Sequence, residues 1–277
     1  KSYDAKFAHG WDVEREQRMA RQKALGIVPQ ETRLPPRNDG VKAWNEHTAD
    51  ERRVFTRLQA AFAGMLDHAD QHLARLIAFL DKAGIRDNTL ILVLSDNGAS
   101  QEGGPLGFVN AMGPYNFRPE PIAEKLRRID DIGGPDSHSN FPHGWAMASN
   151  TPLRRYKQKT HGGGIRDPFV MTWPKKIVAK GEVRHQFVHA CDLTPTLLDL
   201  IGIAPPAEIG GVAQMPLEGE SFARSITDPS APSKSSPQYF EMFGHRGIWH
   251  DGWKAVSFHP SGTPFEGDKW ELFHLDR

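Results

Sequence analysis

A short polar sequence at the end of an apolar segment is the first place in this chain where chemistry could occur. Residues Asn88 to Ser95 are apolar and partly β-branched, which predicts a buried strand, and Asp96-Asn97-Gly98 follows directly. In parallel α/β sheets, ligands collect at the carboxyl ends of the strands. A carboxylate oxygen from Asp96 and an amide oxygen from Asn97 suit calcium or magnesium. Asp-Asn-Gly is also a good turn, so both interpretations stay open at this point.

A second polar segment leads into another predicted strand, Pro168 to Trp173. It begins with Asn150-Thr-Pro152, contains Lys157 and His161, and ends in three consecutive glycines. Several basic side chains surround Lys157, and their simplest interpretation is a solvated basic turn. These neighbours are Arg154, Arg155 and Lys159.

The order and spacing of these two motifs resemble those of the sulfatase family, most closely the branch of large bacterial arylsulfatases. Two further segments fit that branch: Phe7-Ala-His9-Gly-Trp11-Asp near the start and Tyr239-Phe-Glu-Met-Phe-Gly244-His245-Arg near the end. Each motif alone is modest in specificity. Together they extend the resemblance over nearly the whole chain.

The resemblance implies an alkaline-phosphatase-like fold and one bound divalent cation, usually calcium. By this match, Asp96 and Asn97 would be metal ligands, and Lys157 would be a catalytic residue that contacts the substrate sulfate. A metal and an ammonium beside an oxyanion stabilise the charge that builds on the transferred group. His161 is expected to pack beside the site, with substrate contact as the alternative. Gly162 stands where many sulfatases carry Glu. This difference affects the local contacts that the Glu makes in those proteins, but not the assignment of Lys157.

The nucleophile of the family is a formylglycine made from a Cys/Ser-x-Pro/Ala-x-Arg motif. The single cysteine, Cys191, has neither the Pro nor the Arg of that motif, and we expect it to be a small buried residue ahead of a helix. We therefore expect a carboxyl-terminal fragment of a sulfatase, inactive in isolation. A missing amino-terminal region would supply the formylglycine to the parent enzyme.

Hydrophobic periodicity predicts an α/β protein with two parts. Apolar residues spaced by three and four predict a long helix over residues 49–83, which Gly84 ends. We expect a mixed sheet flanked by helices over residues 1–232, with a Pro- and Gly-rich linker at 204–237. A small antiparallel subdomain follows over residues 233–277. The other predicted helices are Val13 to Leu25, Pro121 to Ile129 and Asp192 to Ile201, and the last strands are Gln238 to Phe243, Gly247 to Phe258 and Lys269 to Leu275.

Composition limits the possible partners. Lys plus Arg and Asp plus Glu number 34 each, so no net charge attracts nucleic acid or an anionic membrane. No apolar run approaches the roughly 20 residues needed to span a bilayer. We expect a soluble protein whose partner is a small-molecule sulfate ester. The sequence leaves open the compartment (cytoplasm or periplasm of a bacterium) and the oligomeric state.

Three alternatives remain at this level. Phosphonate monoester and phosphodiester hydrolases of the same superfamily resemble sulfatases closely. A truncated, non-catalytic module is a second alternative. The spacing of His68 and His72 could bind zinc on one helix face, but a zinc protease would need Glu where Ala69 stands, which favours a solvated polar face.

Overall fold

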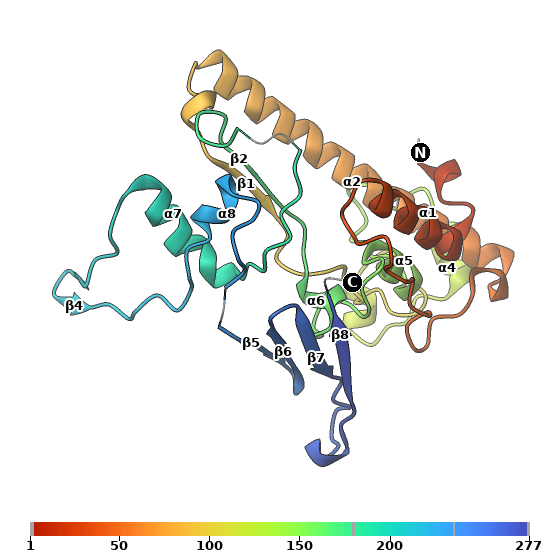
Figure 1. Ribbon diagram of the computed structural model, residues 1–277. Helices are drawn as coiled ribbons and strands as arrows, with labels where there is room; N and C mark the ends of the chain where they lie inside the picture. The colour runs from red at the N-terminus through yellow and green to blue at the C-terminus, as the bar shows by residue number, and fades with distance from the viewer. Residues whose placement is uncertain (1–2, 179–180, 235, 276–277) are drawn as a thin grey trace.

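The computed structural model describes residues 3–178, 181–234 and 236–275. A helical region is joined to small antiparallel sheets (Figure 1). This mixed α/β architecture confirms the predicted fold class. None of the described helices is long and apolar enough to cross a membrane. The principal helices are α1 (Gly10–Ala24), α2 (Ala49–Lys82), α4 (Ile122–Arg127), α5 (His143–Ser149) and α7 (Leu193–Ile201); α3 (Met112–Tyr115), α6 (Gly162–Ile165) and α8 (Ala223–Thr227) are short.

The predicted long helix is α2, and its start is fixed by a capping box. The Thr48 hydroxyl accepts the backbone N–H of Glu51, while the Glu51 carboxylate accepts the backbone N–H of Thr48. Two of the N–H groups that a helix start leaves without partners are thereby satisfied. The first part of α2 is buried through Val54, Phe55 and Leu58.

Aromatic side chains from four elements form the main core. Trp11 of α1 contacts the rings of Trp44, Phe55 and Trp145 at centroid distances of 4.8 to 5.8 Å. The pairs with Trp44 and Trp145 are edge-to-face and the pair with Phe55 is stacked, and aromatic pairs add stabilisation beyond the buried area itself. The core thus fastens α1 and α5 to the first half of α2 (Figure 1).

Strands β1 (Ile91–Leu94) and β2 (Phe169–Thr172) pair antiparallel, with Leu94 opposite Phe169. Both strands were predicted from the sequence, but the expectation that the first is buried is wrong. Val93 is 41% exposed and Leu94 50%. Two paired strands leave one edge of each strand and much of both faces without neighbours, so apolar residues stay in contact with solvent.

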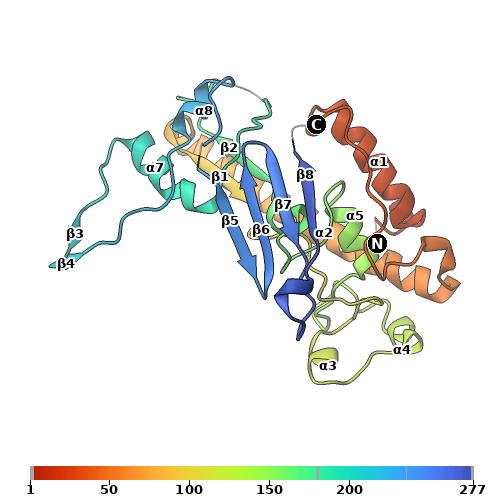
Figure 2. The ribbon, with the colours of Figure 1, turned by 60° about the horizontal axis from the view of Figure 1, so that its bottom comes forward.

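The last part of the chain forms a four-stranded meander in the order β5-β6-β7-β8 (Figure 2). The single strand predicted over residues 247–258 is wrong, because the chain reverses at Asp251-Gly252. Both residues have positive φ, 47° and 77°, as a two-residue hairpin turn requires. The strands are β5 (Gln238–Met242), β6 (His245–His250), β7 (Trp253–Ser257) and β8 (Trp270–His274); β3 (Glu208–Ile209) and β4 (Val212–Ala213) form a separate small pair.

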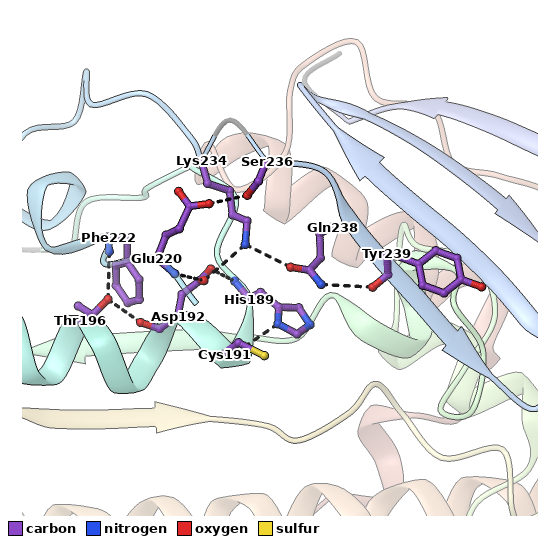
Figure 3. Close-up of polar contacts among 10 residues, drawn as sticks. All are labelled: His189, Cys191, Asp192, Thr196, Glu220, Phe222, Lys234, Ser236, Gln238 and Tyr239. Carbon is purple, nitrogen blue, oxygen red and sulfur yellow. Dashed lines mark hydrogen bonds and ion pairs between the residues drawn. The ribbon is translucent and has the colours of Figure 1, made fainter. Parts of the chain in front are cut away.

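The buried carboxylate of Asp192 fastens the second half of the predicted linker (Figure 3). Its oxygens accept the backbone N–H groups of His189 and Glu220 at 2.8 and 2.9 Å, and the Lys234 ammonium lies 3.5 Å away. Lys234 also donates to Gln238 at the start of β5. Glu220 and Lys234 are therefore anchored to the start of α7, although the composition of this segment predicted a linker. The predicted division between two domains at residue 232 stays a prediction.

Candidate functional site

A crossing of two backbones brings the two polar motifs together. Gly98 N–H donates to the Gly164 carbonyl at 3.1 Å, and Lys157 N–H donates to the Ala99 carbonyl at 3.1 Å. A Cβ atom added at Gly98 would lie 1.8 Å from the Gly163 carbonyl oxygen, so only glycine permits this approach. The turn after β1 and the loop that carries Lys157 consequently form one compact unit.

Asn150 joins the same two segments through its side chain. Its Oδ1 accepts the Ala99 N–H at 2.9 Å, and its Nδ2 donates to the Arg155 carbonyl at 3.0 Å. A single amide that both accepts and donates fixes the spacing between the segments. This accounts physically for the Asn in the Asn150-Thr-Pro motif.

Asp96 and Asn97 stand at the end of β1, as the sequence predicted. The Nδ2 of Asn97 donates to the Gly98 carbonyl at 2.9 Å, so this hydrogen bond does not use the Oδ1 of Asn97. The Asp96 side chain is exposed, and among the described residues it makes no hydrogen bond or ion pair. The carboxylate of Asp96 and the Oδ1 of Asn97 are therefore available as ligands for a cation.

Asp167 lies just before β2, as Asp96 lies just after β1, and the two carboxylates repel each other. Burial, with the charge of Asp96 as the second cause, raises the pKa of Asp167 to about 6. Its Oδ1 is buried and has no hydrogen-bond partner among the described residues. The sequence reasoning did not single out Asp167, although the antiparallel pairing of the two strands places it beside Asp96.

The Lys157 ammonium is held by a carboxylate that the sequence reasoning also missed. Lys157 Nζ lies 3.2 and 3.3 Å from the two oxygens of Glu102. The Ser100 hydroxyl donates to the same carboxylate at 3.0 Å, which fixes its position. Glu102 could be found only by knowing that the Ala99 backbone meets Lys157, because nothing in its local sequence indicates the pairing.

His161 is buried and faces the C-terminal sheet. Its Nε2 lies 3.0 Å from the Glu271 carboxylate on β8, and burial lowers the pKa of His161. The Arg154 guanidinium pairs with the same carboxylate. The expectation of a packing role agrees with this position, and substrate contact by His161 stays a prediction.

Two expectations about neighbouring residues are wrong. The basic residues around Lys157 do not form a solvated turn, because each has a partner: Arg155 lies 2.9 Å from Asp39, and Lys159 lies 2.8 Å from His245. Cys191 is exposed, not buried, since the adjacent Asp192 occupies the interior at this position. It does lie ahead of a helix, as expected.

The donor set fits a hard divalent cation in part. Asp96, Asn97 and Asp167 offer carboxylate and amide oxygens, which calcium prefers. The unpartnered Oδ1 and the raised pKa of Asp167 indicate a place where positive charge would be stabilising. Within the part of the chain that the structure describes, however, no three His, Cys, Asp or Glu residues form a complete metal site. A cation would need further oxygen ligands.

Comparison with known proteins places this geometry in a family. The sulfatase family model matches residues 3–203, and a model described as N-sulphoglucosamine sulphohydrolase, C-terminal, matches residues 156–277. An uncharacterized sulfatase of Schizosaccharomyces pombe is 28% identical over 99% of this chain and 48% of its own length. An arylsulfatase of Klebsiella aerogenes is 28% identical over 80% of this chain and 46% of its own.

A mouse N-acetylgalactosamine-6-sulfatase is 26% identical over 78% of this chain and 34% of its own length. The chain thus spans about half, or less, of the length of these curated relatives. The sulfatase match covers well over half of this chain and contains the turn after β1, the Lys157 loop and the strand that follows. On this match, and with both motifs in one compact unit, the chain belongs to the sulfatase family.

Proposed function

We propose that this chain contributes part of the active site of a sulfuric ester hydrolase of the arylsulfatase type. The observation that carries the proposal is the hydrogen bond from Lys157 N–H to the Ala99 carbonyl. It fixes the backbone of the candidate sulfate-binding lysine two residues from the candidate metal ligand Asn97. A cation bound at Asn97 and the ammonium of Lys157, carried on these adjoining segments, would bind one tetrahedral oxyanion between them.

Asp96 and Asn97 are the proposed ligands for one divalent cation, which we take to be calcium. Asp167 supplies additional negative charge beside them, and its unpartnered Oδ1 favours a cation at this point. Bound calcium would draw electron density from a sulfate oxygen. The formylglycine nucleophile of the family would come from a part of the parent enzyme outside this sequence.

Lys157 is the proposed catalytic residue on the substrate side. Its ammonium would contact the sulfate group and stabilise charge on the leaving oxygen. Glu102 forms an ion pair with this ammonium at 3.2 Å. An incoming sulfate would exchange one anionic partner for another. The proposed substrate is a small sulfate ester.

The test is hydrolysis of an aryl sulfate by the full-length protein. Lys157→Met should lower kcat/KM by about 10²–10³, the usual cost of removing one charge-stabilising donor. Lys82→Met, at the exposed end of α2, is the matched control and should leave kcat/KM unchanged. Normal turnover by Lys157→Met, or a preference for phosphonate monoesters over sulfate esters, would contradict the proposal.

The metal assignment has its own measurement. Asp96→Ala should abolish both calcium binding and aryl sulfate hydrolysis. Isothermal titration calorimetry measures the calcium binding. Retained calcium stoichiometry with normal turnover in this variant would refute the assignment of Asp96.

A further inference from the structure

Two lysines on the same loop have opposite kinds of partner. Lys157 pairs with the carboxylate of Glu102, whereas Lys159 Nζ lies 2.8 Å from Nε2 of His245 on β6. Among the described residues, Lys159 forms no ion pair with a carboxylate. A half-buried lysine that contacts only an imidazole raises the question of which nitrogen carries the proton between them.

The other ring nitrogen of His245 answers this question. The backbone N–H of His259 donates to His245 Nδ1 at 3.0 Å, and a backbone N–H can only donate. Nδ1 must therefore carry the lone pair. A neutral imidazole with its lone pair on Nδ1 has its proton on Nε2. His245 consequently presents an N–H, not a lone pair, to Lys159.

An ammonium at Lys159 would oppose this N–H with another N–H at 2.8 Å, which is repulsive. An uncharged amine has a lone pair and accepts the His245 proton in a normal hydrogen bond. We propose that His245 holds Lys159 as an uncharged amine, which makes Lys159 a nucleophilic site for acyl and carbonyl electrophiles. This assignment is independent of sulfate ester hydrolysis.

The surroundings support the uncharged state. Burial and the charge of Arg155 lower the pKa of Lys159, and burial is also the largest cause that lowers the pKa of His245 to about 4. The guanidinium of Arg155 also lies closer to the Phe258 ring, at 4.4 Å from the centroid against 5.4 Å for Lys159. The permanent cation thus has the better aromatic contact.

The remaining charged groups near this pair have partners of their own. His161, which faces His245 from the loop, is bonded to Glu271. His259 and Arg246 both contact Asp268, at 3.0 and 2.8 Å. The carboxylates in the neighbourhood therefore serve other cations, and none of these contacts offers Lys159 a counter-ion.

The chemistry of such a site is a simple acyl transfer. The Lys159 lone pair attacks the carbonyl carbon of an acyl ester, and the bond from that carbon to the leaving oxygen breaks with its electron pair. The amine proton passes to solvent, and an amide remains on Nζ. Only the uncharged amine can react, so the rate at a given pH reports the free-base fraction.

The experiment treats the full-length protein with a limiting amount of acetic acid N-hydroxysuccinimide ester between pH 7 and pH 10. Mass spectrometry then gives the acetylation rates of Lys159 and Lys157 separately. We expect the Lys159-to-Lys157 rate ratio to be at least about a hundredfold higher at pH 7 than at pH 10, because Lys159 is already free base at pH 7 whereas an ordinary lysine is almost entirely ammonium there. A difference in solvent exposure between the two lysines affects the ratio equally at every pH, so it does not contribute to the change with pH. If the ratio in the wild-type protein does not change with pH, that result by itself overturns the proposal.

Two variants test the role of the imidazole. His245→Phe keeps a ring against Phe258 but removes the Nε2 proton, so the advantage of Lys159 at pH 7 should be lost. His245→Gln places an amide donor near the same position and should retain part of it. An advantage that survives His245→Phe in a protein with an unchanged melting transition would contradict the assigned hydrogen bond.

Discussion

The two halves of α2 have the same apolar periodicity and opposite surroundings. Phe55, in the first half, is 0% exposed and packs against Trp11, whereas Phe79, near the end, is 62% exposed. The second half runs beside β1 and β2, where Val93, Leu94, Phe169 and Val170 are also exposed (Figure 1). The comparison shows that periodicity identifies which residues are suited to burial. It does not tell whether anything covers them.

The largest predicted effect breaks this comparison at the level of stability. Phe55→Ala should lower the free energy of unfolding by about 3–5 kcal/mol, because it leaves a cavity among packed rings. Phe79→Ala on the same helix should change it by no more than about 0.5 kcal/mol. Urea unfolding followed by circular dichroism measures both. Equal losses would mean that the second half of α2 is buried in solution.

A second prediction concerns the crowded turn that follows the exposed strand. Gly98→Ala places a Cβ against the Gly163 carbonyl oxygen and should cost at least about 1–3 kcal/mol, as overpacking does. Gly64→Ala, in α2 with nothing within 4 Å, should instead stabilise the protein by about 0.5–1 kcal/mol. Chemical denaturation of both variants checks the contrast. A neutral Gly98→Ala would exclude the close backbone crossing.

A third prediction uses the raised pKa of Asp167. A carboxyl whose pKa rises to about 6 in the folded state contributes stability at low pH, and this is lost as the pH rises through about 6. Asp167→Asn should therefore stabilise the protein at pH 7 by about 1 kcal/mol, a value discounted for partial exposure. Near pH 4 the gain should be small. Unfolding in EDTA at both pH values measures it, and an equal gain at both would point to a cause other than titration.

The smallest predicted effect concerns the contact between the Lys157 loop and β8. Burial alone would raise the pKa of Glu271, but the hydrogen bond from His161 and the charge of Arg154 outweigh it and hold the pKa below its usual value. Glu271→Gln should cost about 0.5–1 kcal/mol at pH 7. The loss should vanish as the pH falls, because the wild-type carboxylate is then protonated as well.

Glu266→Gln is the control for that measurement. Glu266 is exposed in η5 (Phe265–Gly267), and its replacement should leave the unfolding free energy unchanged at every pH. A pH-independent loss in Glu271→Gln would mean that packing, not charge, holds the loop to β8.

Much of the fold could be predicted from local patterns. The apolar periodicity of α2 and the strand at Ile91 follow from spacing and residue type, because these signals act over a few neighbouring residues. The hairpin at Asp251-Gly252 was missed although its sequence is a strong turn signal. α5 was also missed, since its buried residues, such as Trp145, belong to a helix of only two turns.

The candidate site shows the same limit. Asp96, Asn97 and Lys157 could be found because they belong to ordered motifs. Glu102 and Asp167 could not, since each acquires its meaning from a residue distant in sequence. Burial of the basic loop against Glu271 and His245 likewise depends on the C-terminal sheet. Pairings of this kind are set by tertiary contacts that local sequence does not encode.

The contact of Glu271 with Arg154 and His161 has a consequence for local opening. Because Arg154 and His161 both hold the carboxylate of Glu271, we expect the loop and the strand to open as one cooperative unit. Amide hydrogens of residues 154–161 and of β8 would then exchange with deuterium at similar rates. The more mobile segments of this protein would lie elsewhere, and the Lys157 loop would be as rigid as β8, a strand that is distant in the sequence.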